Sequence, residues 1–168
     1  MPKSEQGVSS QRYQMIPRTL IFITRGSEVL LLKGAPTKRL WANRYNGIGG
    51  HVERGEDILE AAQRELLEET GLVGVDLHLV GTVAVDASDA VGIAIFIYRG
   101  EYRGGEIVPS HEGALEWITL SQLSDLPLVD DLKVLLPRVL THQNGATPFS
   151  ARSYYDEGEQ LRVVIREA

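Results

Sequence analysis

The sequence contains no cysteine. This absence excludes disulfide bonds, thiolate catalysis and cysteine-ligated metal, so a metal ion would have to be held by oxygen atoms or by histidine. Long apolar runs are also missing. No stretch approaches the ~18 residues that cross a bilayer, and residues 1–14 lack the apolar core of a secretion signal. We therefore expect a cytoplasmic protein with no membrane partner.

Positive charge is scarce as well. Lys and Arg number 17 against 23 Asp and Glu, which gives a formal net charge of −6, and no dense basic run is present. Sequence-independent binding to nucleic acid depends on clustered Lys and Arg, so we expect no nucleic-acid partner. An acidic protein can still hold an anionic phosphate substrate when bound divalent cations invert the local potential.

The remaining composition is that of a globular protein. Of the 168 residues, 43% are hydrophobic and 24% are charged, values that are ordinary for one folded domain. Residues 1–15 are polar and aperiodic, and we expect them to form a flexible segment before a single domain at residues 16–168. The sequence leaves the oligomeric state open between a monomer and a homodimer.

The distribution of residue types predicts strands interspersed with a few helices. Strand-like residues occupy positions 18–24, 28–33, 73–85, 91–101 and 115–118, and a hairpin is expected at about 149–166, packed on the domain. Helices are expected at residues 57–70, 121–125 and 130–140, and a loop at residues 34–46. This pattern predicts an α/β fold with a mixed sheet.

The most informative segment surrounds the helix expected at residues 57–70. Gly47, Gly49 and Gly50 precede it and indicate tight backbone geometry or the close approach of a ligand. From Gly50 the chain reads GHVERGEDILEAAQRELLEETGL, which satisfies G-x5-E-x7-R-E-U-x-E-E-x-G-U, where U is a bulky aliphatic residue. The specified residues are Gly50, Glu56, Arg64, Glu65, Leu66, Glu68, Glu69, Gly71 and Leu72. The seven literal residues would coincide by chance about once in ~10^8 windows.

The spacing has a chemical reason. Residues three and four apart share a helix face, so Glu65, Glu68 and Glu69 are predicted to form one acidic cluster. Such a cluster is stable when it holds a hard cation, and Mg²⁺ prefers oxygen ligands, which Mn²⁺ also accepts. A bound cation polarises phosphoryl oxygens and activates water, while Arg64 would orient a carboxylate. The alternative is an amphipathic helix whose glutamates are merely solvent-exposed. The match of Gly50 and Gly71 to their positions in the motif disfavours this alternative.

Residues 50–72 match the complete Nudix box, and the chain is identified by it as a member of the Nudix family. The resemblance implies an α/β/α sandwich with a mixed sheet, in which the box forms a catalytic loop-helix-loop that hydrolyses nucleoside diphosphates linked to another moiety. It also implies metal binding by the carbonyl of Gly49 and by Glu65, Glu68 and Glu69. Either Glu65 or a glutamate outside the box would be the general base.

Outside the box, the chain resembles the MutT-type enzymes that remove oxidised purine nucleotides, especially their animal branch. Residues 45–50 are similar to the W-N-G-F-G-G of that branch, which implies that Asn46 hydrogen-bonds the purine. Glu112 stands five residues before Trp117, as in the branch's E-x4-W, and would add a metal ligand. Without the resemblance, Asn46 would be interpreted as a turn former and Glu112 as a solvent-exposed loop residue.

Four further residues are candidates for substrate binding. Asp130 and Asp131 stand near the place of an acidic pair that reads the base, although acidic residues also occur at helix starts, where they complement the dipole. Trp41 lies in a loop, where it could stack on a base. His51 occupies a position at which a lysine is common in the family. The loop before Asn46 is also about two residues longer than in that branch, a difference that loops tolerate.

The complete box and the resemblance around Asn46 together imply a Mg²⁺-dependent hydrolase of nucleoside triphosphates, similar to 8-oxo-dGTP diphosphatases, that releases the monophosphate and pyrophosphate. The alternative substrates are ADP-ribose, other nucleotide sugars and dinucleoside polyphosphates, which the longer loop favours. A non-catalytic module that senses a nucleotide is a third hypothesis. It would favour loss of the box glutamates, and all of them are present.

Overall fold

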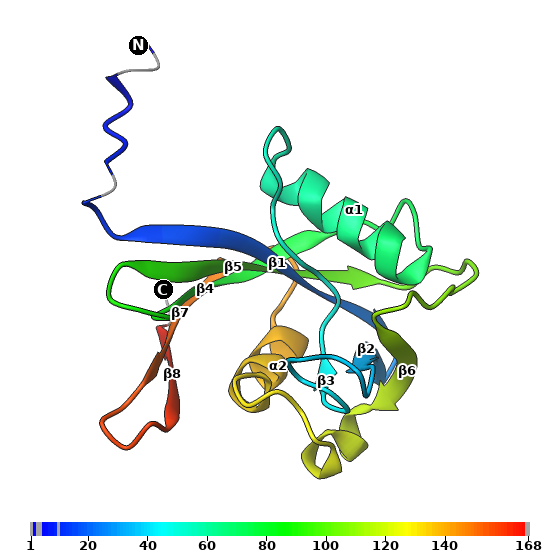
Figure 1. The fold of residues 1–168 in the computed structure, drawn as a ribbon. Helices are drawn as coiled ribbons and strands as arrows, with labels where there is room; N and C mark the ends of the chain where they lie inside the picture. The colour runs from blue at the N-terminus through cyan, green and yellow to red at the C-terminus, as the bar shows by residue number, and fades with distance from the viewer. Residues whose placement is uncertain (1, 3–4, 10, 167–168) are drawn as a thin grey trace.

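The computed structural model describes residues 2, 5–9 and 11–166 (Figure 1). Its elements are β1 (Gln14–Arg25), β2 (Glu28–Gly34), β3 (Tyr45–Asn46), α1 (Ile58–Thr70), β4 (His78–Val85), β5 (Val91–Glu101), β6 (Gly113–Thr119), the 3₁₀ helix η2 (Leu120–Asp125), α2 (Leu132–Thr141), β7 (Phe149–Tyr155) and β8 (Leu161–Arg166). Within these residues the strands form one eight-stranded sheet in the order β3-β2-β1-β5-β4-β7-β8, with β6 paired to β2. The sheet is mixed, because β1 runs parallel to β5, and β4 parallel to β7.

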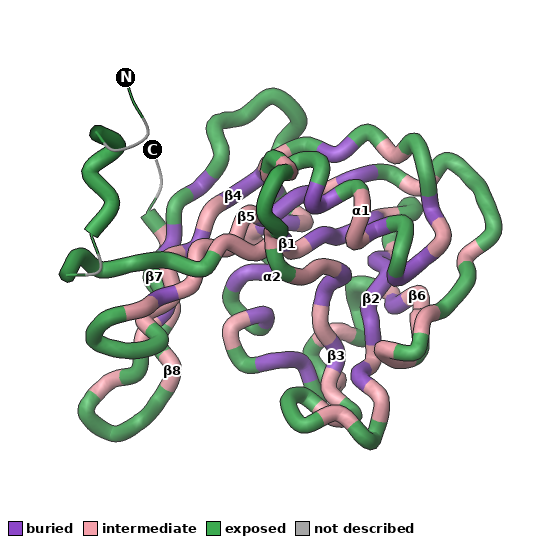
Figure 2. The backbone as a smooth tube through the Cα atoms, turned by 45° about the horizontal axis from the view of Figure 1, so that its top comes forward, coloured by how far each residue is buried: buried purple, intermediate pink, exposed green. Residues whose placement is uncertain are grey.

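The central strand β1 is covered on both of its faces. Ile21 and Ile23 belong to a hydrophobic cluster that includes Leu66 of α1, whereas Phe22 belongs to a second cluster that includes Leu135 of α2. Consecutive side chains of a strand point to opposite faces of the sheet, so the two clusters lie on the two sides of it. The buried residues gather on the central strands and on the inner helix faces (Figure 2). The fold is therefore the α/β/α sandwich that the sequence predicts.

Helix α1 ends at the predicted residue and begins one residue later than predicted, because Asp57 is its N-cap. The Asp57 side chain accepts hydrogen bonds from the backbone N–H groups of Leu59 (2.8 Å) and Glu60 (2.9 Å), and the Glu60 carboxylate accepts one from the Asp57 N–H (2.8 Å). This capping box satisfies backbone donors that the helix leaves unpaired. Gly71 ends the helix in the left-handed region (φ 74°), where its N–H donates to the Leu67 carbonyl.

One predicted strand is too long at its start. The sequence predicts a strand from residue 73, but β4 begins at His78. Gly74 has a φ of 67°, which a β-strand does not accommodate. The apolar residues Val75 and Leu77 instead pack into the cluster beneath α1. Their strand-like composition therefore reflects burial under the helix rather than strand pairing.

Further boundaries differ from the prediction, among them that of β6, which begins at Gly113 instead of residue 115. The last two residues of the predicted loop form β3, which pairs with β2 through Asn46 and Leu32. Helix α2 begins at Leu132, with Asp131 as its N-cap. Strand β1 already begins at Gln14, inside the segment expected to precede the domain, because residues 14–17 pair with residues 91–94 of β5.

The remaining predictions of strands are confirmed, including β5 with its predicted bounds and the closing hairpin of β7 and β8. Among the described residues, no helix is long and apolar enough to cross a membrane.

Candidate active site

The glycine-rich segment between β3 and α1 lies directly beside β1. Backbone hydrogen bonds run from Thr19 N–H to the Gly50 carbonyl (2.9 Å) and from Ile21 N–H to the Ile48 carbonyl (2.7 Å). Gly49 has a φ of 140°, and a Cβ atom there would collide with the Thr19 backbone. Only glycine fits this approach, so the segment is held against the central strand by its sequence.

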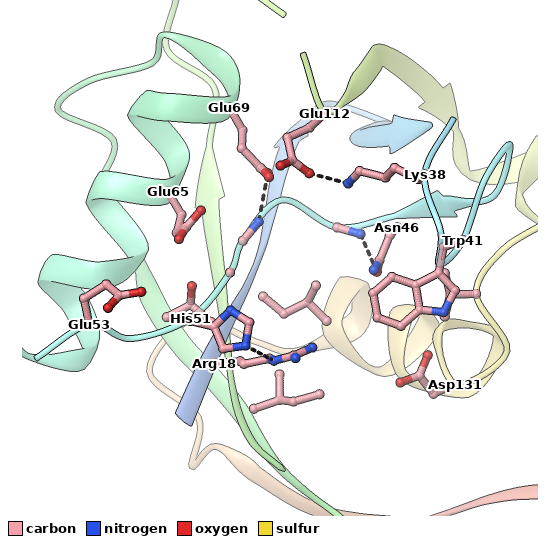
Figure 3. A pocket seen from close by; sticks show the side chains of 17 residues that line it. Arg18, Lys38, Trp41, Asn46, His51, Glu53, Glu65, Glu69, Glu112 and Asp131 are labelled. Carbon is pink, nitrogen blue, oxygen red and sulfur yellow. Dashed lines mark hydrogen bonds and ion pairs between the residues drawn. The ribbon is translucent and has the colours of Figure 1, made fainter. Parts of the chain in front are cut away.

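The next glycine makes room for a carboxylate. A Cβ atom on Gly50 would lie 2.5 Å from Oε1 of Glu65. Any larger residue would therefore displace the Glu65 carboxylate. Glu65 and Glu69 are four residues apart on α1 and point from the same helix face toward this segment (Figure 3).

These residues border a cavity of about 390 Å³. Its polar lining consists of Arg18, Thr19, Lys38, Trp41, Asn46, His51, Glu53, Glu65, Glu69, Glu112 and Asp131, together with Gly47, Gly49 and Gly50. Its apolar lining consists of Leu20, Ile95 and Val129. The glutamates of α1 and Glu112 lie at one end of the cavity, and Trp41, Asn46 and Asp131 lie at the other (Figure 3).

Glu69 is the most buried acidic residue of the cavity, with 6% of its surface exposed. Burial raises its pKa to about 7, and the negative charges of Glu112 and Glu65 act in the same direction. The Gly49 N–H, which donates to Oε2 of Glu69 at 3.0 Å, and the Lys38 charge oppose this shift. A buried carboxylate beside two others has a strong affinity for a cation.

Arg64 organises the carboxylates along the edge of the cavity. Its guanidinium donates to both oxygens of Glu56 (2.8 and 3.0 Å) and to Oε1 of Glu65 (2.7 Å). It also donates to the His51 carbonyl (2.9 Å) and to Glu68 (3.2 Å). Arg64 holds the pKa of Glu56 down at about 2. Glu68, whose side chain is 57% exposed, lies outside the cavity lining.

Glu112 reaches the cavity from the turn before β6. Its carboxylate is paired with the ammonium of Lys38, which comes from the long loop between β2 and β3. Figure 3 shows Glu112 beside Glu69, with Lys38 on its other side. The structure therefore brings Glu65 and Glu69 of the helix together with Glu112, which lies 43 residues after Glu69 in the sequence.

At the opposite end, Asn46 and Asp131 face the cavity. Oδ1 of Asn46 accepts a hydrogen bond from the Gly47 N–H (2.8 Å), which leaves the amide N–H groups to donate to a ligand. Burial raises the pKa of the Asp131 carboxyl, and the neighbouring Asp130 charge adds to the effect. Trp41 stands over this end with a left-handed backbone (φ 61°) and a 43% exposed side chain.

Asp130 points elsewhere. It accepts hydrogen bonds from both terminal nitrogens of Arg44 (3.0 and 3.3 Å) and from the Lys133 ammonium (3.1 Å), and it is absent from the cavity lining. These two cations lower its pKa. Of the two acidic residues singled out from the sequence, the cavity therefore contains only the second.

Several lining residues were not singled out from the sequence. Arg18 and Leu20 alternate along β1, and Arg18 Nε donates to Nε2 of His51 (3.1 Å). Thr19 is 3% exposed, and its hydroxyl has no hydrogen-bond partner among the described residues. Period-two alternation could have grouped Arg18 with Leu20. No sequence signal shows that β1 borders the glycine-rich segment, since that contact is tertiary.

The donor set at the acidic end fits a hard divalent cation. Carboxylates of Glu65, Glu69 and Glu112 converge on the cavity beside Gly49, and oxygen atoms are the ligands that Mg²⁺ and Mn²⁺ prefer. Within the described residues, no three Asp, Glu or His side chains already enclose a single cation position. A cation would have to compete with Arg64 for Glu65 and with Lys38 for Glu112.

Comparison with known proteins adds an independent line of information. A family model described as the NUDIX domain matches residues 15–139. An oxidized purine nucleoside triphosphate hydrolase of Mus musculus is 30% identical over 150 residues, which cover 89% of this chain and 93% of that protein. An NAD-capped RNA hydrolase NudC of Stutzerimonas stutzeri is 33% identical over 116 residues, which cover 68% of this chain and 40% of that protein. The crystal structure of a MutT protein from Bacillus halodurans shares the fold, with a TM-score of 0.74 at 24% identity over 90% of this chain and 97% of that one.

Proposed function

This chain belongs to the NUDIX family of hydrolases, and from that premise we propose that it is a metal-dependent pyrophosphohydrolase of purine nucleoside triphosphates. The observation that carries the proposal is a single cavity with two unlike ends. One end gathers Glu65, Glu69 and Glu112, and the other gathers Asn46 and Asp131 over an apolar floor. A triphosphate needs cations, whereas a base needs directed hydrogen bonds on an apolar surface.

The acidic end would hold the metal. Glu69, Glu112 and the Gly49 carbonyl are the proposed ligands, and Mg²⁺ is the preferred ion, with Mn²⁺ as an alternative. A divalent ion bound there would polarise the phosphoryl oxygens and make a water molecule more acidic. Glu68 would contribute indirectly, since Arg64 holds it on the outer side of the helix.

Glu65 is the proposed general base. Arg64 binds its Oε1 at 2.7 Å, which fixes the carboxylate and leaves Oε2 to accept a proton from the attacking water. The water oxygen would form a bond to phosphorus as the bond to the pyrophosphate oxygen breaks. The products are then the nucleoside monophosphate and pyrophosphate. Lys38 and Arg18, which also line the cavity, offer positive charge to the phosphates.

The opposite end would bind the base. Asn46 would donate from its amide, and Asp131 would exchange hydrogen bonds with the ring edge, while Trp41 stacks above. Leu20, Ile95 and Val129 provide the apolar floor. The likeness to a mouse hydrolase of oxidized purine nucleoside triphosphates supports a purine in this place, and 8-oxo-dGTP is the first candidate.

The test is steady-state hydrolysis with and without Mg²⁺ across 8-oxo-dGTP, dGTP, pyrimidine triphosphates, ADP-ribose and a diadenosine polyphosphate, with the products separated by chromatography. We expect Mg²⁺-dependent release of pyrophosphate and a preference for the purine triphosphates. Equal turnover of purines and pyrimidines would reject the base-binding end. Absence of metal-dependent turnover of every compound would reject the proposed chemistry.

A second candidate substrate is a dinucleotide or nucleotide sugar. The loop between β2 and β3 carries Lys38 and Trp41 to the cavity rim, where a second nucleoside or a sugar would extend. The likeness to an NAD-capped RNA hydrolase points the same way, although this chain spans 40% of that protein's length. Release of AMP and a sugar phosphate from ADP-ribose, at a higher kcat/KM than that of any triphosphate, would favour this candidate.

A further inference from the structure

An ion pair outside the cavity connects the two segments that carry the proposed base-binding residues. Arg44 lies two residues before Asn46, and Asp130 lies immediately before Asp131. The two terminal nitrogens of Arg44 donate to separate oxygens of Asp130, at 3.0 and 3.3 Å. Two parallel hydrogen bonds of this kind fix orientation as well as distance, because both groups are planar.

The backbone between these residues is paired as well. The Tyr45 N–H donates to the Pro127 carbonyl (3.0 Å), and the Val129 N–H donates to the Tyr45 carbonyl (3.0 Å). Tyr45 and Leu128 thus form an isolated parallel bridge. Tyr45, Leu128 and Val129 are also buried in one hydrophobic cluster, so the two segments are held together at their backbones. The ion pair lies next to this bridge and adds a side-chain connection on its outer side.

The two neighbouring carboxylates Asp130 and Asp131 have different surroundings. Asp130 is occupied by Arg44 on one side and by Lys133 on the other, whereas Asp131 lines the cavity. We propose that Arg44 and Asp130 form a positioning pair that sets the separation between Asn46 and Asp131, and thereby the preference for a purine base. This inference rests on the proposed function of the cavity and adds residues that contact no substrate.

The positions of the two side chains predict a selective effect. They are 39% and 50% exposed, and exposed ion pairs contribute little to the stability of a fold. Loss of the pair should therefore leave the unfolding temperature almost unchanged. It should weaken base binding by about fivefold. An exposed ion pair can favour the binding-competent arrangement of Asn46 and Asp131 by no more than its own modest free energy. Cleavage at the acidic end should proceed as before.

The experiment compares Arg44→Gln, Arg44→Lys, Asp130→Asn and the double variant that combines Arg44→Gln with Asp130→Asn against the control Lys133→Gln. Lys133 also contacts Asp130 (3.1 Å), but from three residues further along the same segment, so its loss leaves the connection to Arg44 intact. KM and kcat are measured for dGTP and dCTP with Mg²⁺. Metal-free binding of dGMP is followed by tryptophan fluorescence, because Trp41 lines the cavity. Thermal unfolding is recorded for every variant.

We expect Arg44→Gln and Asp130→Asn to raise KM for dGTP and weaken dGMP binding by about fivefold each, with kcat unchanged. The double variant should be no worse than either single one, because the two residues act as a unit. Arg44→Lys should recover part of the loss, and Lys133→Gln should stay within about twofold of the original protein.

Unchanged KM and dGMP binding in Arg44→Gln would overturn the inference, and so would additive losses in the double variant. An equal loss for dCTP would overturn it too, since a positioning pair for purines should alter discrimination. If the original protein shows no preference between dGTP and dCTP, the proposed base-binding end itself is contradicted. Unchanged KM values in Arg44→Gln, with the preference present in the original protein, contradict only the positioning role of the ion pair.

Discussion

At the scale of single residues, the cavity shows how one sequence motif produces several different environments. Glu65 is held by an arginine, Glu68 faces solvent, and Glu69 is buried against the backbone of Gly49. The three residues are the same amino acid on one helix. Their different contacts follow from where each side chain points relative to the glycine-rich segment.

Replacement of Glu69 should separate chemistry from folding. Glu69→Gln keeps the shape of the side chain and the acceptor for the Gly49 N–H, but it removes the charge that a metal requires. We expect turnover to fall by at least ~10²-fold, a loss typical of removing one charge-stabilising group from an active site. Steady-state hydrolysis with Mg²⁺ measures it.

The matched control is Glu157→Gln, which alters an exposed glutamate in the turn between β7 and β8. It should leave both turnover and the unfolding temperature unchanged. Turnover by Glu69→Gln at the rate of the control would remove Glu69 from the proposed metal site.

Glu56 permits a prediction about pH. Arg64 lowers its pKa from 4.5 to about 2 in the folded protein. A carboxyl with a depressed folded pKa stabilises the fold above its unfolded pKa, and this contribution is lost as the pH falls toward the folded value. Glu56→Gln should therefore lower the unfolding temperature at pH 7. The difference from the original protein should shrink between pH 4.5 and about pH 2.

Thermal unfolding of both proteins at pH 7 and pH 3 tests this expectation. A difference that is constant over this interval would show that Glu56 acts through packing rather than through its charge.

At the scale of elements, the two ends of helix α1 are stabilised by their caps. Its first turn is stabilised by the reciprocal hydrogen bonds of Asp57 and Glu60, and its last turn by Gly71. The rotation of the helix is set by its buried residues, including Ala62 and Leu66, which pack against the sheet while Glu65 and Glu69 line the cavity. A weakened cap should thus affect stability before it affects chemistry.

Asp57→Ala removes the side chain that accepts from Leu59 and Glu60. Loss of such a cap costs about 1 kcal/mol, and we expect that decrease in the free energy of unfolding by urea. Asp89→Ala, in the exposed turn between β4 and β5, is the control and should be neutral. If both variants unfold at the same urea concentration, the capping box contributes no stability.

At the scale of the whole molecule, the helices on the two sides of the sheet have different tasks. Helix α1 carries the proposed catalytic groups, whereas α2 fills the second hydrophobic cluster and places Asp131 at its start. Both clusters meet at β1, which also supplies Arg18, Thr19 and Leu20 to the cavity. The core therefore positions the cavity walls.

Truncation of Leu135, which is fully buried in α2, should destabilise the whole fold. We expect Leu135→Ala to lower the free energy of unfolding by roughly 2–5 kcal/mol, the range for cavities left in packed cores. Val134→Ala on the same helix is the control. Val134 is 44% exposed, so its truncation should change stability by at most about 0.5 kcal/mol. Equal losses in urea unfolding would contradict the assignment of Leu135 to the core.

The sequence alone determined the parts that depend on local spacing. The helix expected at residues 57–70, with Gly71 at its end, and the four-residue spacing of Glu65 and Glu69 follow from local sequence and helical geometry. The content of β-branched and aliphatic residues likewise predicted β2, β5 and the closing hairpin. These features need no information about distant parts of the chain.

Only the tertiary structure decided which distant residues share the cavity. Tyr45 of β3 is bridged to Leu128, and Glu112 lies near Glu69 because β6 pairs with β2. Asp130 is likewise paired outside the cavity with Arg44, 86 residues before it in the chain. Local spacing cannot encode such contacts, since they form only when the whole sheet and both of its helical layers come together.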